Sequence, residues 1–319
     1  MATSAARAPG PMTARPIDGR ARARELGAAL ADEVAALHAS GIRPGLATVL
    51  PGDAGFGARA YRRRLHRLAA ELGVGHRTVE LPAGASQAAV LDAVRSCNDD
   101  PAVSGVLLLR PLPAGVDQAT VFGALDPAKD VEALHPENVG LLALGAPRFV
   151  PATPAAVFDL LDTWIDGTGQ DRDGFYHRSR IVVVGRSATV GVPAVALGCA
   201  RGATVSSIDE WADRTGGIGR YTRWADVLVV AAGRAGLVRA EHVAPGAVVL
   251  DVGINAVTGP DGTVRTVGDV DAGSVAARAA ALTPVPGGVG PVTDVLLLRS
   301  TVLAARRAAT AAAGSRAAS

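Results

Sequence analysis

The distribution of apolar residues along the chain predicts two successive series of strands and helices. Apolar positions at helical spacing predict a first helix over residues 17–39, which Gly41 would end. The elements that follow are expected to be a strand at 44–50, a helix at 61–72, a strand at 77–81, a helix at 87–97 and a strand at 105–109. Since strands that alternate with helices form a parallel sheet with helical crossovers, the first half is predicted to be an α/β domain.

The second series begins after a predicted helix at 154–164 and a polar stretch at 166–174. The run RIVVV, residues 180–184, is almost wholly apolar, as in a strand whose sheet is covered on both faces. Further elements are expected as a helix at 191–200, strands at 203–208, 227–231 and 247–252, and an alanine-rich helix at 294–313. Residues 126–154 are expected to form a long loop of the kind that carries ligands.

Length and composition narrow the class of protein. A chain of 319 residues suits two α/β domains, and its residues are 49% hydrophobic and 19% charged. The net charge of +2 and the 3% of aromatic residues do not indicate a nucleic-acid-binding surface, which would be basic and carry aromatic side chains. We expect no membrane span, no signal peptide and no metal site. Because Cys97 and Cys199 make no disulfide framework, the expected compartment is the cytoplasm.

Lysine is almost absent from the chain. Of the 32 basic residues, Lys129 is the one lysine. The simplest explanation is a coding bias in which arginine replaces lysine wherever only a charge is needed. A lysine position that does not become arginine therefore indicates a lost function.

The segment VVVGRSATVGVP, residues 182–193, carries candidate phosphate-binding chemistry. It places Gly185 at the end of a strand and Gly191 at the start of a helix. Glycine lets a backbone approach a phosphate, and the amides at a helix N-terminus bind the anion. The spacing differs from the usual G-x-G-x-x-G fingerprint, so a tight turn without a ligand stays an alternative for this segment taken alone.

Several further motifs carry a resemblance to a known family. They are IDG (17–19), RPLPAG (110–115), KDVEALHPENVG (129–140), PATP (151–154), DVGIN (251–255), GDV (268–270) and TPVPGGVGPVT (283–293). In this order they resemble the bifunctional methylenetetrahydrofolate dehydrogenase/cyclohydrolase family over about residues 16–310. The resemblance implies hydride transfer from 5,10-methylenetetrahydrofolate to NAD or NADP, followed by hydrolysis of the methenyl product.

The resemblance also implies an architecture. After a disordered tail at residues 1–15, an N-terminal α/β domain would cover 16–155 and bind the tetrahydrofolate derivative. A Rossmann-type dinucleotide-binding domain would cover 156–293. A C-terminal helix at about 294–313 would return to the first domain, and the cleft between domains would hold both ligands. Family members are usually homodimers, so a second copy of the chain is the expected partner.

The residues that match the family's folate site show losses as well as retention. The family's tyrosine corresponds to Tyr61, but its lysine, four positions later, corresponds to Leu65. The family's glutamine corresponds to Leu109, and its usual serine to Ala58. Leucine activates no water, so this comparison predicts weak or absent cyclohydrolase activity. Arg64, the residue before Leu65, could turn its side chain into this position, but it would be a poor base.

The remaining basic residues of this segment, Arg62, Arg63, Arg64 and Arg67, are expected to form a solvated face, and His66 to lie at the surface.

Other substrate contacts also follow from the resemblance. The family's pterin-binding aspartate corresponds to Glu132, and the glycine after it to Ala133. Pro286, Gly287 and Gly288 are expected to contribute to the substrate site.

The expected cofactor-binding residues lie in the second half of the chain. They are Gly185, Arg186, Ser187, Val190, Gly191, Asp209, Gly253, Ile254 and Thr293. Asp209 follows a predicted strand, 24 positions after Gly185, where a carboxylate accepts hydrogen bonds from a ribose diol and repels a 2′-phosphate. This favours NAD over NADP. The alternatives remain that Asp209 caps the next turn, and that Arg186 binds a 2′-phosphate.

The sequence therefore predicts an NAD(P)-dependent dehydrogenase. Two other functions stay open. One is an oxidoreductase of the same fold that acts on another imine in specialised metabolism, and the other is a non-catalytic binding paralogue. Intact cofactor loops argue against the last, because a scaffold has no need of them.

Overall fold

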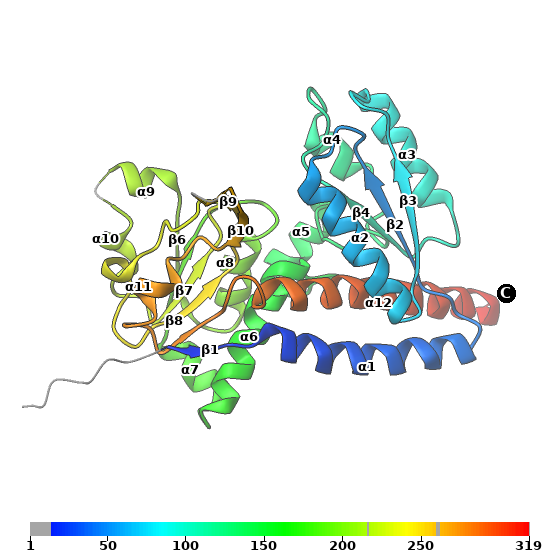
Figure 1. Cartoon of the computed structure of the whole chain (residues 1–319). Coiled ribbons are helices and arrows are strands. Elements are labelled where there is room, and N and C mark those ends of the chain that lie inside the picture. Colours follow the sequence, from blue (N-terminus) through cyan, green and yellow to red (C-terminus); the bar gives the residue numbers. More distant parts are fainter. Residues whose placement is uncertain (1–13, 216, 260–261, 319) are drawn as a thin grey trace, which may run out of the picture. The chain divides into compact units, whose positions relative to one another are not determined.

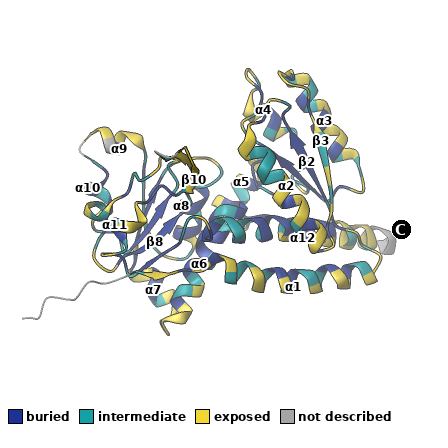
Figure 2. Cartoon of the chain, in the orientation of Figure 1, coloured by how far each residue is buried: buried dark blue, intermediate teal, exposed yellow. Residues whose placement is uncertain are grey.

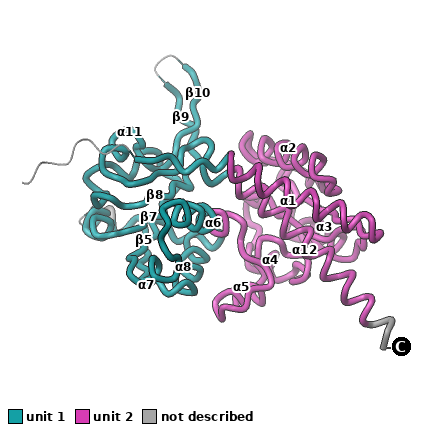
Figure 3. Tube along the Cα trace, turned by 90° about the horizontal axis from the view of Figure 1, so that it is seen from below, with its two compact units in different colours: residues 1–20, 157–290 teal, residues 21–156, 291–319 magenta. Residues whose placement is uncertain are grey.

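The computed structural model describes residues 14–215, 217–259 and 262–318 (Figure 1). The chain forms two compact units (Figure 3). Unit 1 comprises residues 1–20 and 157–290, and unit 2 comprises residues 21–156 and 291–319. Each unit has its own sheet and its own apolar core.

Unit 2 is built on a three-stranded parallel sheet with the order β3-β2-β4. Its strands are β2 (Gly45–Leu50), β3 (Gly75–Glu80) and β4 (Gly105–Leu108). The helices mainly in this unit are α1 (Gly19–Ala39), α2 (Phe56–Glu71), α3 (Gln87–Asp99), α4 (Gln118–Gly123), α5 (Pro136–Ala143) and α12 (Val289–Ala318). Helix α6 (Ala152–Gly167) runs from this unit into unit 1.

Alternation along β2 divides the core of unit 2 between the two faces of the sheet. Leu46 and Leu50 join the cluster that holds buried residues of α1, α2 and α12. Ala47 and Val49 join the opposite cluster, which holds buried residues of α3 and α4. The sheet is therefore covered by helices on both sides, which explains why β2 and β4 are apolar with little alternation, whereas the edge strand β3 is more polar.

Unit 1 contains a six-stranded parallel sheet with the order β1-β11-β8-β7-β5-β6. Its strands are β1 (Arg15–Pro16), β5 (Arg180–Val184), β6 (Thr204–Ile208), β7 (Val227–Val230), β8 (Val248–Asp251) and β11 (Ala281–Leu282). Strands β7 and β8 are buried along their whole length, and Figure 2 shows β8 in the colour of buried residues. This doubly wound sheet confirms the predicted α/β class.

Shorter elements complete unit 1. The helices are α7 (Arg172–Arg178), α8 (Gly191–Ala200), α9 (Glu210–Arg214), α10 (Gly219–Thr222), α11 (Ala272–Val275) and the 3₁₀ helix η1 (Ala240–His242). An antiparallel hairpin joins β9 (Asn255–Thr258) to β10 (Val264–Val267) and projects from the unit (Figure 3).

The structure corrects two sequence-based predictions. Residues 1–13 of the expected tail lie outside the described residues, but Arg15 and Pro16 form β1, which pairs with β11 and so places residues 14–20 in unit 1. The expected loop at 126–154 contains helix α5, which begins where His135 Nδ1 accepts the Glu137 amide and Pro136 occupies the first turn. The prediction of an uninterrupted loop is therefore wrong.

Candidate functional site

A cavity of about 290 Å³ opens in unit 1 at the carboxyl ends of β5, β6 and β7. In a doubly wound sheet this edge is where ligands bind. The cavity is lined by Val184, Gly185, Arg186, Ser187, Asp209, Glu210, Ile218, Ala231, Ala232, Arg234 and Leu237. It therefore includes four of the expected cofactor-binding residues.

The turn from β5 to α8 requires its glycines. Gly185 has φ +114°, and a Cβ added there would lie 2.1 Å from the Ala231 carbonyl oxygen. A Cβ on Gly191 would lie 2.0 Å from the Gly185 oxygen. Only glycine allows this close approach of backbone to backbone, and a turn without Cβ atoms at these two positions suits the approach of a phosphate.

Ser187 organises the amides at the start of α8. Its hydroxyl oxygen accepts from the Val190 amide at 3.2 Å and from the Gly191 amide at 3.4 Å. The expected phosphate-binding residues are thus brought together in one turn. A phosphate oxygen is chemically equivalent to this hydroxyl oxygen as an acceptor for the same amides.

Asp209 and Arg186 face each other at the end of β6. Arg186 donates to Asp209 Oδ2 at 3.0 Å and to the Ser207 carbonyl oxygen at 2.7 Å. Asp209 Oδ1 accepts from the Trp211 amide at 3.1 Å, so the residue also caps α9. Both interpretations of Asp209 from the sequence are compatible with this geometry, because a capping carboxylate still lines the cavity.

Two buried carboxylates that the sequence analysis missed support the DVGIN and GDV segments. Asp251 Oδ1 accepts from the amides of Gly253 at 2.9 Å and Asp269 at 3.0 Å, and its Oδ2 accepts from Val270. Burial raises the pKa of Asp251 to about 6, and the three amides act against this rise. Asp269 in turn accepts from the Ala232 amide at 2.6 Å, at the end of β7.

These aspartates explain the glycines next to them. A Cβ on Gly253 would lie 2.3 Å from Asp269 Oδ1, and a Cβ on Gly268 would lie 1.8 Å from Asp251 Oδ2. Ile254, within the DVGIN segment, is 67% exposed and can contact a ligand. The aspartates within the two motifs were the available signal for this network.

In unit 2, Leu65 and Leu109 are part of the apolar core. Both are buried, with exposed fractions of 0% and 5%, and they belong to one cluster that also contains Leu107 and Leu298. Tyr61 is partly buried and packs against the same cluster, one helical turn from Leu65 on α2. The structure therefore places these three expected site residues together, with Tyr61 as the one polar group among them.

Arg64 forms an ion pair that the sequence analysis did not predict. Its Nε donates to Asp294 Oδ2 at 2.5 Å and its Nη2 to Oδ1 at 3.1 Å. The guanidinium carbon lies 5.1 Å from the centre of the Tyr61 ring. Burial, reinforced by the charges of Asp294 and Glu132, raises the pKa of the Tyr61 hydroxyl, which stays protonated.

Arg64 is paired with the buried carboxylate of Asp294 but keeps 49% of its side chain exposed, whereas Arg62 is only partly exposed. Arg63 and Arg67 are exposed as expected, and so is His66, whose Nδ1 lies 3.0 Å from His76 Nδ1.

Glu132 is also engaged in an ion pair. Arg110 Nη2 donates to Glu132 Oε1 at 2.9 Å, while Arg110 Nη1 and Glu132 Oε2 are buried without a hydrogen-bond partner among the described residues. Burial raises the pKa of the Glu132 carboxyl, although Arg110 acts against this rise. Ala133, which corresponds to the family's glycine, has φ +55°, in the left-handed region that is strained for alanine.

Lys129 and Asp130 fix the segment that carries Glu132. The Lys129 ammonium donates to the carbonyl oxygens of Asn98 at 2.5 Å, Asp100 at 2.8 Å and Cys97 at 3.3 Å, all at the end of α3. Asp130 accepts from the His135 amide and from the Asn138 side chain, both at 2.8 Å. A compact ammonium fits three converging carbonyls better than a planar guanidinium does, which gives a reason for the single lysine.

The remaining expected site residues divide between the units. Gly287 and Gly288 lie in unit 1 with Pro286, where a Cβ on Gly19 would lie 1.8 Å from the Gly288 carbonyl oxygen. Thr293 lies on α12, in unit 2.

The described residues contain neither a candidate metal-binding group nor a membrane-spanning helix. No group of three or more His, Cys, Asp or Glu residues in that part of the chain could hold a metal ion. Among the same residues, no helix is both long enough and apolar enough to span a membrane.

A doubly wound sheet with a cavity and a glycine turn at its carboxyl edge defines the class, an oxidoreductase with a dinucleotide-binding domain. Comparison with known proteins narrows the class to a family. The profile of the tetrahydrofolate dehydrogenase/cyclohydrolase catalytic domain matches residues 17–132, and that of its NAD(P)-binding domain matches residues 151–309. The chain belongs to the tetrahydrofolate dehydrogenase/cyclohydrolase family.

Individual relatives agree with this assignment. The chain is 56% identical to bifunctional protein FolD 3 of Rubrobacter xylanophilus over 92% of its length and 93% of that protein. Among solved structures it resembles the Trypanosoma brucei methylenetetrahydrofolate dehydrogenase-cyclohydrolase complexed with NADP and an inhibitor. That match has 36% identity and a TM-score of 0.84, and covers 93% of this chain and 99% of the other. The Campylobacter jejuni FolD enzyme is 33% identical, with a TM-score of 0.82 and coverage of 91% and 98%.

Proposed function

We propose that the protein is a methylenetetrahydrofolate dehydrogenase that prefers NAD and has weak or no cyclohydrolase activity. The observation that carries this proposal is the burial of Leu65 in the aliphatic core, at the position of the family's lysine. Hydride transfer requires two rings held face to face, whereas hydrolysis also requires a group that handles a proton. The two activities therefore depend on different residues, so this chain can keep the dehydrogenase activity while the cyclohydrolase activity is weak or lost.

Neither Lys129 nor Arg64 offers a substitute for the missing lysine. Lys129, the one lysine of the sequence, is bound by three carbonyl oxygens at the end of α3. Arg64 is held by both oxygens of Asp294, and this hydrogen bond raises the pKa of its guanidinium further. A guanidinium in this state accepts no proton from water, although it can stabilise negative charge.

The dinucleotide domain fits an NAD(P) cofactor, which supplies the hydride acceptor when bound. The turn at Gly185 and Gly191 would hold the phosphates, because a Cβ at either position would meet backbone. The amides that Ser187 now binds are available donors for the same oxygens. Asp251 holds the DVGIN backbone in place, where Gly253 and Ile254 would contact the cofactor.

The preference for NAD rests on Asp209. Its carboxylate lines the cavity at the end of β6, where it would accept from a ribose diol and repel a 2′-phosphate. Arg186, the residue best suited to a 2′-phosphate, is already paired with Asp209 at 3.0 Å. NADP binding would require that pair to separate.

A second candidate function is supported by Arg110. Because this arginine binds Glu132 Oε1, one carboxylate oxygen is withdrawn from the task of binding a pterin amine. The pocket would then suit a different imine or iminium substrate. We also propose, from the resemblance, a cytoplasmic homodimer.

The decisive test is an absorbance assay with 5,10-methylenetetrahydrofolate and NAD or NADP, which follows reduced cofactor and methenyl product together. We expect both to accumulate, with NAD the better substrate, since the methenyl product is not hydrolysed. Rapid loss of the methenyl product beyond its uncatalysed rate would refute the loss of cyclohydrolase. If a bifunctional relative is active under the same conditions and this protein is not, calorimetry with NAD separates the remaining possibilities. Cofactor binding would favour another imine substrate, and no binding would favour a non-catalytic paralogue.

A further inference from the structure

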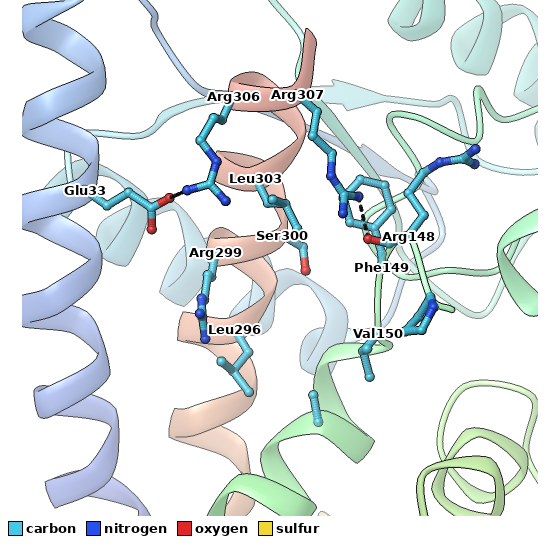
Figure 4. A pocket seen from close by; sticks show the side chains of 12 residues that line it. Glu33, Arg148, Phe149, Val150, Leu296, Arg299, Ser300, Leu303, Arg306 and Arg307 are labelled. Atoms are coloured by element: carbon cyan, nitrogen blue, oxygen red, sulfur yellow. Dashed lines mark hydrogen bonds and ion pairs between the residues drawn. The ribbon is translucent and has the colours of Figure 1, made fainter. Parts of the chain in front are cut away.

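Unit 2 contains a second cavity, of about 380 Å³, that none of the expected folate residues lines. It lies between α12 and the segment at residues 147–150, with Glu33 of α1 on one side (Figure 4). Its apolar lining comes from Phe149, Val150, Leu296 and Leu303. A volume of this size is within the range of small-molecule sites.

The polar lining of the cavity is dominated by arginines of α12. Arg299, Arg306 and Arg307 lie on this helix within nine consecutive residues, and Ser300 points into the hollow between α12 and residues 147–150 (Figure 4). The one carboxylate in the lining is Glu33, which accepts from Arg306 Nη1 at 2.8 Å. The cavity therefore carries a clear excess of positive charge.

Two of these arginines are not neutralised by a carboxylate. Arg307 donates to the Arg148 carbonyl oxygen at 2.6 Å, and its guanidinium carbon lies 5.5 Å from the centre of the Phe149 ring. This contact orients the guanidinium but leaves its charge uncompensated. Arg299 has no hydrogen bond or ion pair within the described part of the chain, and the Ser300 hydroxyl has none there either. Two cationic groups and a hydroxyl are thus available to a ligand.

Arg148 contributes its backbone rather than its charge. Its side chain leads away from the hollow in Figure 4, and its guanidinium binds Glu137 and Asn138. The charge available for binding is therefore concentrated on one face of α12.

We propose that this cavity binds a small molecule with at least two oxyanion groups, of the phosphate or carboxylate class, in addition to the active site. Arg299 and Arg307, the two arginines without a carboxylate partner among the described residues, are eight residues apart, or about 12 Å along a helix, so a single phosphate does not reach both. A diphosphate or a polycarboxylate covers more of this distance. Guanidinium groups bind such oxyanions in bidentate fashion, and the apolar lining accommodates the body of the ligand.

The test is isothermal titration calorimetry with pyrophosphate and, in a separate arm, citrate. The whole protein is first saturated with NAD, because the phosphate-binding turn of unit 1 would otherwise bind the probe. We expect saturable binding of at least one probe, weakened at least tenfold in Arg299→Gln and Arg307→Gln. Arg95→Gln is the matched control, since Arg95 is exposed, bears the same charge and lies on α3 outside the cavity. Arg95→Gln should change the affinity for the probe less than twofold. The probe that binds more tightly, pyrophosphate or citrate, identifies the ligand class as phosphate or carboxylate.

Two results would overturn the proposal. One is the absence of saturable heat with either probe, and the other is equal weakening in all three arginine variants, which indicates non-specific charge attraction. Arg299→Gln is the cleaner variant, because that side chain has no described partner whose loss would disturb the fold. Dehydrogenase turnover without probe should be unchanged in Arg299→Gln, so failure of this proposal is distinguishable from failure of the proposed function.

Discussion

Arg64 and Asp294, 230 residues apart in the sequence, form a bidentate ion pair beside the Tyr61 ring. The pair joins α2 to the start of α12 within unit 2. Asp294 is 3% exposed, and burial raises the pKa of its carboxyl while Arg64 acts against the rise. A buried carboxylate is thereby kept next to the arginine that occupies the position before Leu65.

Breaking this ion pair should destabilise unit 2. Asp294→Asn removes a charge-assisted contact, and we expect the free energy of unfolding to fall by about 1–2 kcal/mol, reduced from the value for a fully buried pair because Arg64 is half-exposed. Denaturant unfolding of Asp294→Asn, Arg64→Gln and the double variant measures the coupling. Strictly additive effects of the two substitutions would show that the contact contributes nothing.

Cofactor choice should change when Asp209 is replaced. Asp209→Ala removes the acceptor for a ribose diol and releases Arg186, so kcat/KM with NAD should fall about tenfold to a hundredfold while kcat/KM with NADP rises. Initial rates with each cofactor provide the measurement. Arg186→Gln is the matched variant, in which activity with NAD should be retained and any activity with NADP lost. An unchanged NAD to NADP ratio in Asp209→Ala would assign this residue to the capping of α9 alone.

The turn before α8 should not tolerate a side chain at its second glycine. Gly191→Ala places a Cβ 2.0 Å from the Gly185 oxygen, so the turn must open, and we expect at least a tenfold loss of NAD affinity by calorimetry. Gly273→Ala in the same unit is the control, because its Cβ would meet Asp271 Oδ1 at an ordinary 3.6 Å. Equal NAD affinity in the two variants would contradict a phosphate-binding role for this turn.

Stability should depend on pH through His76. Burial, with smaller contributions from His66 and Arg62, lowers the pKa of His76 to about 4 from its usual 6.5. The folded state then binds fewer protons than the unfolded state between pH 4 and 6.5, so stability falls as the pH drops through this window. We expect this loss to be about 1–2 kcal/mol, since the ring is only partly buried.

Denaturant unfolding of the wild type and His76→Gln at pH 7.5 and pH 4.5 isolates the effect. The wild type should lose more stability than the variant over this interval. Arg95→Gln, an exposed change on α3, should follow the wild type. If the difference in free energy of unfolding between wild type and His76→Gln is the same at both pH values, the titration of His76 is not the cause of the pH dependence.

Much of the architecture could be predicted because elements such as strand β5 and helix α8 are specified by their local sequence. The apolar run at 180–184 and the glycine at 191 define β5 and α8 at the observed residues. Strands β1 and β11 have two residues each, too few for any periodicity, and they exist because they pair with neighbours. Helix α5 was missed because Pro136 and Gly140 were treated as loop residues, although proline is favoured in a first helical turn.

The candidate site was predictable where chemistry sits within a motif and not where it depends on distant partners. Gly185, Ser187 and Gly191 act within one turn, so their spacing already indicates their role. The partner of Arg64 lies on another helix, and no local pattern identifies it. The same holds for Arg110, whose bond to Glu132 depends on how β4 and the segment at 129–135 meet.

The ammonium of Lys129, enclosed by three carbonyl oxygens, gives the native protein an internal reporter. A reagent that acylates amines has one lysine side chain to attack in the whole sequence. Hydrogen bonding to these carbonyls ties up the ammonium, so acylation should be faster when the segment carrying Glu132 separates from the end of α3. The rate of lysine acylation should therefore report how often this segment separates from α3, without any engineered probe.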